Sequence, residues 1–111
     1  MLNIRHAADD GQRAVVAATG QVDLATAPEL AAVLAQAIES GTPELVVDLR
    51  GVDFLDSAGI GVLVEAARTA TAGRVAMSVH GAHGWVARVL QITGLEDYLR
   101  VVPHPPADAD R

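Results

Sequence analysis

The chain has 111 residues, half of them hydrophobic and 3% aromatic, which is the size and composition of one globular domain with a core of alanine, valine and leucine. The formal net charge of −6, with eight arginines and no lysine, argues against binding to nucleic acid or to an anionic membrane surface. Because there is no cysteine, the sequence excludes a disulfide framework and a thiolate metal site.

The first half of the chain predicts two strands and a helix. Residues 2–5 have the pattern of a short edge strand, and residues 13–22 that of a second strand, rich in β-branched side chains. Thr26 opens a helix, because T-A-P-E has the form of a capping box in which Glu29 reaches back to the helix start. Apolar residues then recur at helical spacing, so one face of this helix is expected to pack on the core.

Strands and helices continue to alternate in the second half. Residues 44–49 are a short apolar run typical of a buried strand, and R-G-V-D-F bridges to a helix over residues 57–72. The inward stripe of that helix is expected to be Ile60, Leu63, Val64, Ala67 and Ala70. A strand over residues 73–81 leads to an amphipathic helix over residues 84–94, in which Trp85 points inward. A last turn and edge strand follow.

This alternation predicts an α/β fold in a single layer, with a mixed sheet of four to five strands and about four helices packed against it. We expect one domain over residues 1–102. Residues 103–111 are proline-rich and acidic and are expected to form a flexible tail. The start of the chain lacks the apolar segment of a signal peptide, and no apolar run approaches the length of a membrane span, so we expect a cytoplasmic protein.

The segment V-D-F-L-D-S-A-G-I-G-V, residues 52–62, places Ser57 at the junction of a strand and a helix. A serine there can cap the helix, a role that Asp56 fills equally well. It can also accept a phosphate group, because free backbone N–H groups and the positive end of the helix dipole stabilise an anion. Gly59 and Gly61 each weaken the helix by roughly 1 kcal/mol relative to alanine, and we explain them by the close approach of another protein.

The outer flank of the same helix is also expected to face a partner. At about 100° per residue, Val62 points away from the inward stripe. Its neighbours on that flank are Ala58, Ala66 and Thr69. This predicts a small exposed apolar patch beside Ser57.

Three other readings of the chemistry are weaker. A nucleophile elbow needs G-x-S-x-G, but Leu55 stands in place of the first glycine, and none of the four histidines is in an obvious position to act as a base. A dinucleotide fingerprint needs a third glycine after G-I-G-V, and no G-K-S/T sequence occurs. His80 and His83 have no clear third metal ligand. We therefore predict no catalytic residue, no metal and no cofactor in this chain.

The sequence V-V-D-L-R-G-V-D-F-L-D-S-A-G-I-G-V-L-V-E-A-A-R, residues 46–68, resembles the signature of the STAS domain family. This family includes anti-sigma factor antagonists and the tails of sulphate transporters. G-Q-V-D-L-A-T-A-P-E-L, residues 20–30, is similar to the turn before the family's first helix, and V-L-Q-I-T-G-L-E-D-Y-L, residues 89–99, to its closing helix and turn. The resemblance extends over about residues 2–102.

The resemblance implies the STAS fold and a stand-alone anti-sigma factor antagonist. Members of that kind bind an anti-sigma factor, which is a serine kinase, and so free the sigma factor for transcription. The kinase then phosphorylates the serine that matches Ser57, and the antagonist dissociates. A phosphatase of the PP2C type restores the binding form. Many members have serine or threonine where this chain has Ala58, so Ser57 is the only hydroxyl in the loop.

We expect the partner to bind a surface formed by residues 23–26 and 56–62, around Ser57 as phosphoacceptor. The partner-binding residues are Asp23, Leu24, Ala25, Thr26, Asp56, Ala58, Gly59, Gly61 and Val62. Asp56 either orients Ser57 or caps the helix. Asp23 either contacts the kinase or binds the backbone of its own turn.

Two other functions are compatible with this fold. A STAS scaffold subunit of a lipid-transport or stress-signalling complex would use the same surface without phosphate chemistry. A sensor of a small ligand would bind it at the sheet edge, in an apolar pocket.

Overall fold

The fold is a five-stranded sheet with three helices in residues 1–9 and 11–106, the part of the chain that the computed structural model describes. The strands are β1 (Leu2–Asp9), β2 (Arg13–Val22), β3 (Glu44–Leu55), β4 (Ala76–His80) and β5 (Val101–Val102). The helices are α1 (Ala27–Glu39), α2 (Ser57–Ala72) and α3 (Gly84–Ile92). The sheet has the order β1-β2-β3-β4-β5, with β1 antiparallel to β2 and the other pairs parallel.

The predicted α/β fold with a mixed sheet is therefore confirmed. The predicted number of about four helices is too high for the described residues, which contain three. None of the helices in this part of the chain has the length and hydrophobicity needed to cross a membrane.

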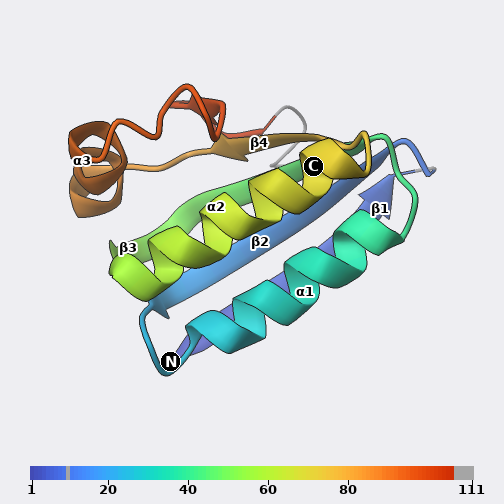
Figure 1. Cartoon of the computed structure of the whole chain (residues 1–111). Coiled ribbons are helices and arrows are strands. Elements are labelled where there is room, and N and C mark those ends of the chain that lie inside the picture. The colour runs from blue at the N-terminus through green and yellow to red at the C-terminus, as the bar shows by residue number, and fades with distance from the viewer. Residues whose placement is uncertain (10, 107–111) are drawn as a thin grey trace.

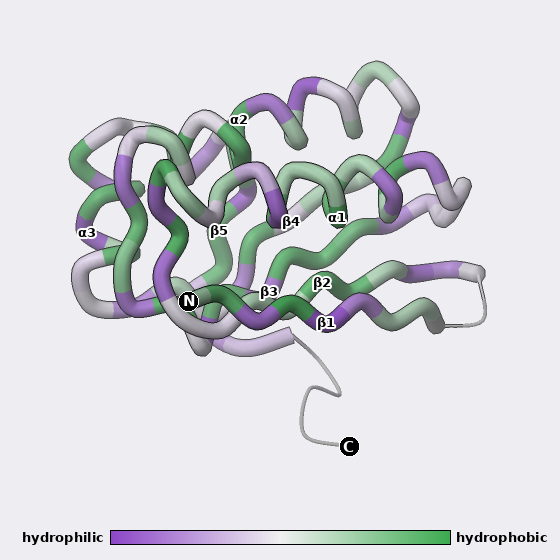
Figure 2. Tube along the Cα trace, turned by 90° about the horizontal axis from the view of Figure 1, so that it is seen from below, coloured by the Kyte–Doolittle hydropathy of each residue, from purple (hydrophilic) through white to green (hydrophobic). Residues whose placement is uncertain are grey.

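The two long helices cover one face of the sheet and enclose the core with it. α1 and α2 lie side by side and run along the strands (Figure 1), and Figure 2 shows both on the same side of the sheet. Alternate residues of β2 are buried beneath them, and so are the inward leucines of the helices: Ala14, Val16, Ala18, Leu30, Leu34 and Leu63. Burying a leucine side chain contributes roughly 1.5–3 kcal/mol, so this layer fixes both helices on the sheet.

Two strands are longer than predicted. β1 continues to Asp9, because it pairs with β2 in an unbroken antiparallel register. β3 continues through R-G-V-D-F to Leu55, where we predicted a bridge between elements. The pairing of β2 with β3 has two register shifts, at each of which β3 has one more residue than β2, and Val22 lies beside Leu55 at the end of both strands.

Two helices face the core differently from the prediction. In α2, Leu63, Ala67 and Ala70 are buried as predicted, but Ile60 and Val64 are only half-buried. Ala66, which we placed on the exposed flank, is buried because α1 lies against that side of α2. In α3, Trp85 is 52% exposed instead of inward, and the helix packs through Val86 and Leu90.

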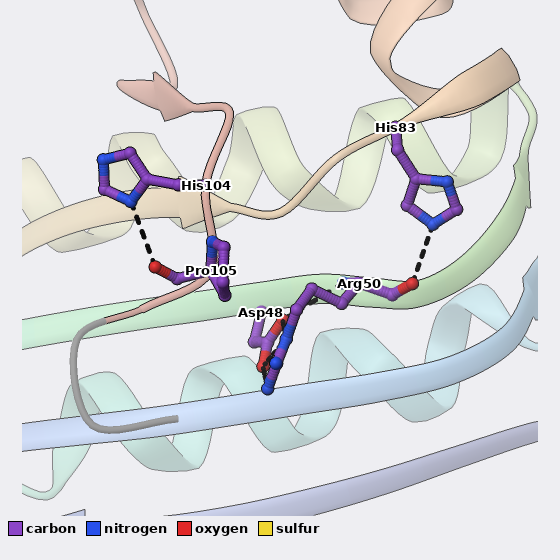
Figure 3. A network of polar contacts seen from close by, with 5 residues as sticks. All are labelled: Asp48, Arg50, His83, His104 and Pro105. Atoms are coloured by element: carbon purple, nitrogen blue, oxygen red, sulfur yellow. Dashed lines mark hydrogen bonds and ion pairs between the residues drawn. The ribbon is translucent and has the colours of Figure 1, made fainter. Parts of the chain in front are cut away.

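The face of the sheet away from the helices carries a polar cluster (Figure 3). The carboxylate of the buried Asp48 accepts hydrogen bonds from the backbone N–H and the guanidinium of Arg50, both at 3.1 Å. Nε2 of His83 donates to the carbonyl of Arg50 at 2.7 Å, whereas Nε2 of His80 lies 3.0 Å from the hydroxyl of Ser78. The two histidines that we considered as metal ligands therefore have separate partners.

Part of the predicted tail packs on this polar face. The ring of His104 lies edge-on to that of His80, with centroids 6.0 Å apart. His104 Nδ1 donates to the carbonyl of Pro105 (Figure 3). Pro106 is buried. Residues 103–106 thus contact the domain, while residues 107–111 of the tail lie outside the described residues. The flexible tail itself stays a prediction.

We expect the free energy of unfolding to decrease in mild acid through His80. Burial is the main cause that lowers its pKa below the ordinary value of 6.5; His104 and Arg13 lower it further, and Asp48 and Glu44 oppose them. As the pH falls, the unfolded chain takes up this proton before the folded chain does, so the stabilising effect is complete above pH 6.5 and is lost as the pH falls through the folded pKa.

Denaturant unfolding near pH 8 and near pH 5 measures this effect. His80→Asn is expected to reduce the loss of unfolding free energy between the two conditions. His6→Asn, at an exposed position, is the matched control and should keep the full pH dependence. The same pH dependence in His80→Asn as in the unmodified chain would contradict the prediction.

Candidate functional site

The two segments predicted to bind a partner lie together at the carboxyl ends of β2 and β3. β2 and β3 are parallel neighbours and both end there, with Val22 paired to Leu55. Each strand turns directly toward a helix, α1 after β2 and α2 after β3. The backbone N–H of Asp56 donates to the carbonyl of Val22 at 3.2 Å, which joins the two turns.

Asp56, not Ser57, caps α2. Its side-chain oxygen accepts hydrogen bonds from the backbone N–H groups of Ala58 at 2.9 Å and Gly59 at 3.1 Å. Of the two roles left open for Asp56, the structure therefore shows the cap. Ser57 is the first residue of the helix, and it is exposed.

This cap corrects one part of our reasoning about Ser57. We expected a phosphate group there to find free backbone N–H groups, but the carboxylate of Asp56 already binds those of Ala58 and Gly59. The helix dipole still favours an anion at this end. A phosphate on Ser57 would nevertheless lie next to a carboxylate and compete with it, so its charge would remain directed at solvent or at a partner.

Removing the cap is expected to destabilise the domain. Asp56→Ala leaves the N–H groups of Ala58 and Gly59 without their acceptor and should lower the free energy of unfolding by about 1 kcal/mol. Asp56→Asn keeps an acceptor oxygen of the same reach and should retain most of that stability. Urea unfolding of both variants measures the difference, and equal losses would show that the hydrogen bonds are not the cause.

The turn before α1 is built on Asp23. Its carboxylate accepts from the backbone N–H groups of Ala25 at 3.0 Å and Thr26 at 3.1 Å, and the Thr26 hydroxyl accepts from the N–H of Asp23 at 3.0 Å. These hydrogen bonds, that of the Thr26 N–H first, hold the pKa of Asp23 below its usual value. Asp23 thus has the turn role that we left open, and its contact with a kinase stays a prediction.

The capping box that we predicted at Thr26 and Glu29 is wrong. Thr26 makes no side-chain cap to α1. Its hydroxyl is engaged with Asp23 and with the carbonyl of Gln21, to which it donates at 2.8 Å. The reciprocal pair of the capping box is formed one turn earlier, by Asp23 and Thr26.

The two glycines of α2 have different surroundings. Gly59 is buried, and a Cβ atom there would lie 2.5 Å from Leu55 Cδ1 and 2.9 Å from Val22 Cγ1. Close packing of α2 on the strand ends, not the approach of a partner, therefore explains this glycine. Gly61 is exposed, with nothing within 4 Å of such a Cβ atom, so the original explanation still applies to it.

The apolar flank of α2 forms one wall of a groove. The groove has a volume of about 290 Å³ and runs between α1 and α2. Ala58, Gly61 and Val62 line it from α2, and Ala31, Leu34 and Ala35 from α1. The apolar patch predicted beside Ser57 is thus partly enclosed by α1. Beyond it, Leu24 is 79% exposed in the turn before α1.

The α1 wall of this groove was missed in the sequence. Ala31 and Ala35 are spaced four residues apart, which places them on one face of the helix, next to the inward Leu34. Small residues at that spacing, facing a second helix of small residues, are the only signal that the sequence carried. The pocket that we associated with a ligand sensor was expected at the sheet edge, whereas the apolar groove lies between the two helices.

These features define a small α/β domain with an exposed serine at a helix start, beside an open apolar groove. The chain belongs to the STAS domain family: the family model described as "Mlab, STAS domain" matches residues 6–103. The resemblance seen in the sequence is confirmed by this match.

Relatives and solved structures agree with this family. An anti-sigma-B factor antagonist of Staphylococcus aureus is 32% identical over 82 residues, which are 74% of this chain and 76% of the relative. An anti-sigma factor antagonist from Mycobacterium paratuberculosis has a TM-score of 0.82 at 25% identity, over 97% of this chain and 89% of that one. The Bacillus cell fate determinant SpoIIAA in its phosphorylated form has a TM-score of 0.70 at 17% identity, over 90% and 91% of the two chains, which shows a shared fold.

Proposed function

We propose that this chain is an anti-sigma factor antagonist that regulates sigma-factor-dependent transcription in the cytoplasm. It binds an anti-sigma factor of the serine kinase class while Ser57 is unmodified, and it dissociates when Ser57 is phosphorylated. The observation that carries the proposal is the exposed Ser57 as the first residue of α2, next to the turn at Asp23 that completes the contact surface.

The relatives support the proposal in two ways. The similar proteins from Staphylococcus aureus and Mycobacterium paratuberculosis are anti-sigma factor antagonists. SpoIIAA, which shares the fold, exists in a phosphorylated form. Ser57 lies within the 98 residues, 6–103, that the family model matches.

The chemistry at Ser57 requires only the hydroxyl from this chain. Its oxygen attacks the γ-phosphorus of ATP bound to the kinase, ADP leaves, and the hydroxyl proton passes to a base of the kinase. The product carries about −1.5 to −2 charges at pH 7. A PP2C-type phosphatase hydrolyses the ester and restores the neutral hydroxyl. The antagonist itself catalyses nothing in this cycle.

The added charge explains release without a large conformational change. The surface around Ser57 is already acidic, because it carries Asp23, Asp53 and Asp56. Asp56 also accepts hydrogen bonds from two of the backbone N–H groups that could stabilise a phosphate. Burying the phosphate against a partner that offers no cation therefore leaves it uncompensated, which costs several kcal/mol. The fold tolerates the modified state because the phosphate points outward from an exposed residue.

Phosphorylation in vitro tests the proposal. The chain is incubated with ATP and the anti-sigma factor kinases of its source organism, and its mass is measured. We expect an increase of one phosphate group, mapped to Ser57, and none in Ser57→Ala. Thr26, the nearest hydroxyl in the neighbouring turn, serves as internal control because its hydrogen bonds hold it in the turn.

The second candidate is the STAS scaffold subunit, which would use the same surface without phosphate chemistry. The matching family model supports the scaffold function, because its description names Mlab and no anti-sigma factor. An unchanged mass with every kinase, together with stable binding to a multi-subunit complex, would favour the scaffold over the antagonist.

A further inference from the structure

The groove between α1 and α2 begins beside the phosphoacceptor. Ala58 and Gly61, which line it, are one and four residues after Ser57 in the first turns of α2. A kinase that brings ATP to the Ser57 hydroxyl has to cover this end of the groove. The groove is therefore continuous with the contact surface of the proposed function, on which this inference rests.

The lining suits an apolar occupant. Near Ser57 the walls consist of alanine, glycine, leucine and valine, and the polar residues Glu65 and Thr69 lie at the other end. Those two are already satisfied: the Thr69 hydroxyl donates to the Glu65 carbonyl at 3.0 Å, and Arg68 Nε donates to the Glu65 carboxylate at 3.1 Å. Nothing in the lining is left to orient a polar ligand.

The size of the groove favours a side chain over a free small molecule. Its volume of about 290 Å³ is at the lower limit of small-ligand sites, which span about 300–1,000 Å³. One or two apolar side chains presented by a helix are the usual occupants of a groove between two helices. At the far end the Glu65 carboxylate is paired with Arg68, so the apolar walls near Ser57 are the part of the groove that remains open to a partner.

We propose that the groove between α1 and α2 receives an apolar anchor side chain from a helix of the anti-sigma factor kinase. Glu65 is eight residues after Ser57, about 12 Å along the helix axis. The α2 wall of the groove extends from Ala58 to Thr69, so the groove can be filled by a substitution that leaves Ser57 unchanged. The anchor contributes affinity for the kinase, and the charge of phosphorylated Ser57 weakens the complex.

Filling the groove tests the anchor. Ala35 is exposed and lines the groove from α1, so Ala35→Phe occupies it without entering the core. Ala32→Phe places the same side chain on the same helix at an exposed position that does not line the groove, and is the matched control. The kinase is recovered from the source organism with the unmodified chain and titrated with each variant in the presence of ADP. We expect Ala35→Phe to bind at least tenfold more weakly, at roughly 1.4 kcal/mol for each tenfold, and Ala32→Phe to bind as the unmodified chain does.

Two controls separate this inference from the proposed function. If the unmodified chain binds and Ser57→Asp does not, but Ala35→Phe binds like the unmodified chain, the anchor is wrong and the switch stands. If the unmodified chain recovers no kinase from the source organism, both are overturned. A photo-crosslinking amino acid at position 35 should label the kinase; labelling of a second copy of this chain instead would assign the groove to self-association and overturn the anchor.

Discussion

Ser57→Asp is expected to weaken binding to the anti-sigma factor kinase about a thousandfold, which corresponds to three steps of about 1.4 kcal/mol. The substitution puts a permanent negative charge beside Asp56, whose carboxylate already takes the N–H groups of Ala58 and Gly59. The complex would bury that charge without a cation to pair with it. Isothermal titration calorimetry with the kinase measures the effect.

Ser57→Asn is the matched control for this prediction. It has nearly the same shape as the aspartate variant but no charge, so it should bind the kinase within a few fold of the unmodified chain. Ser57→Ala should also bind, and should remain bound when ATP is added, because it cannot be modified. All three variants should fold, since Ser57 is exposed and an acidic residue in the first turn of a helix is stabilising. Equal affinities of the aspartate and asparagine variants would remove the charge switch from the mechanism.

The sequence predicted α2 to its last residue because the signals there agree. Asp56 is a residue type that caps helices well, and the apolar residues recur at helical spacing up to Ala70. The start of α1 carries two overlapping patterns, D-x-x-T from Asp23 and T-x-x-E from Thr26. Only T-x-x-E has the Glu of the capping-box rule, yet in the structure Asp23 and Thr26 form the reciprocal pair.

Features that depend on the distance between two helices or between a helix and a strand could not be predicted from the sequence. Ala66 is buried and the groove exists because α1 and α2 rest on neighbouring strands at a particular separation, which no periodicity within one helix contains. The same holds for Gly59: a glycine in a helix looks permissive until the side chains of Val22 and Leu55 are seen against it. The exposure of Ser57, in contrast, followed from its place at a polar helix start.

Substitution by alanine is expected to change the free energy of unfolding in opposite directions at Gly59 and Gly61. Gly59→Ala places a Cβ atom 2.5 Å from Leu55 Cδ1 and 3.1 Å from the Val22 carbonyl oxygen, so the helix has to move off the strand ends. Overpacking of this kind costs typically about 1–3 kcal/mol, and the better helix propensity of alanine offsets roughly 1 kcal/mol of it. We expect a net loss of up to about 2 kcal/mol in the free energy of unfolding. Gly61→Ala meets no atom within 4 Å and should gain about 0.5–1 kcal/mol.

Denaturant unfolding of the two variants, side by side, tests whether the glycines serve packing or recognition. Since both sit in the same turn of α2, differences in helix propensity cancel between them, and the sign of the difference reports the contact with Val22 and Leu55 alone. A stabilised Gly59→Ala would show that α2 is free to shift at its start. If Gly61→Ala gains stability yet binds the kinase more weakly, Gly61 is retained for recognition; unchanged binding would show that a methyl group fits between the two proteins at this position.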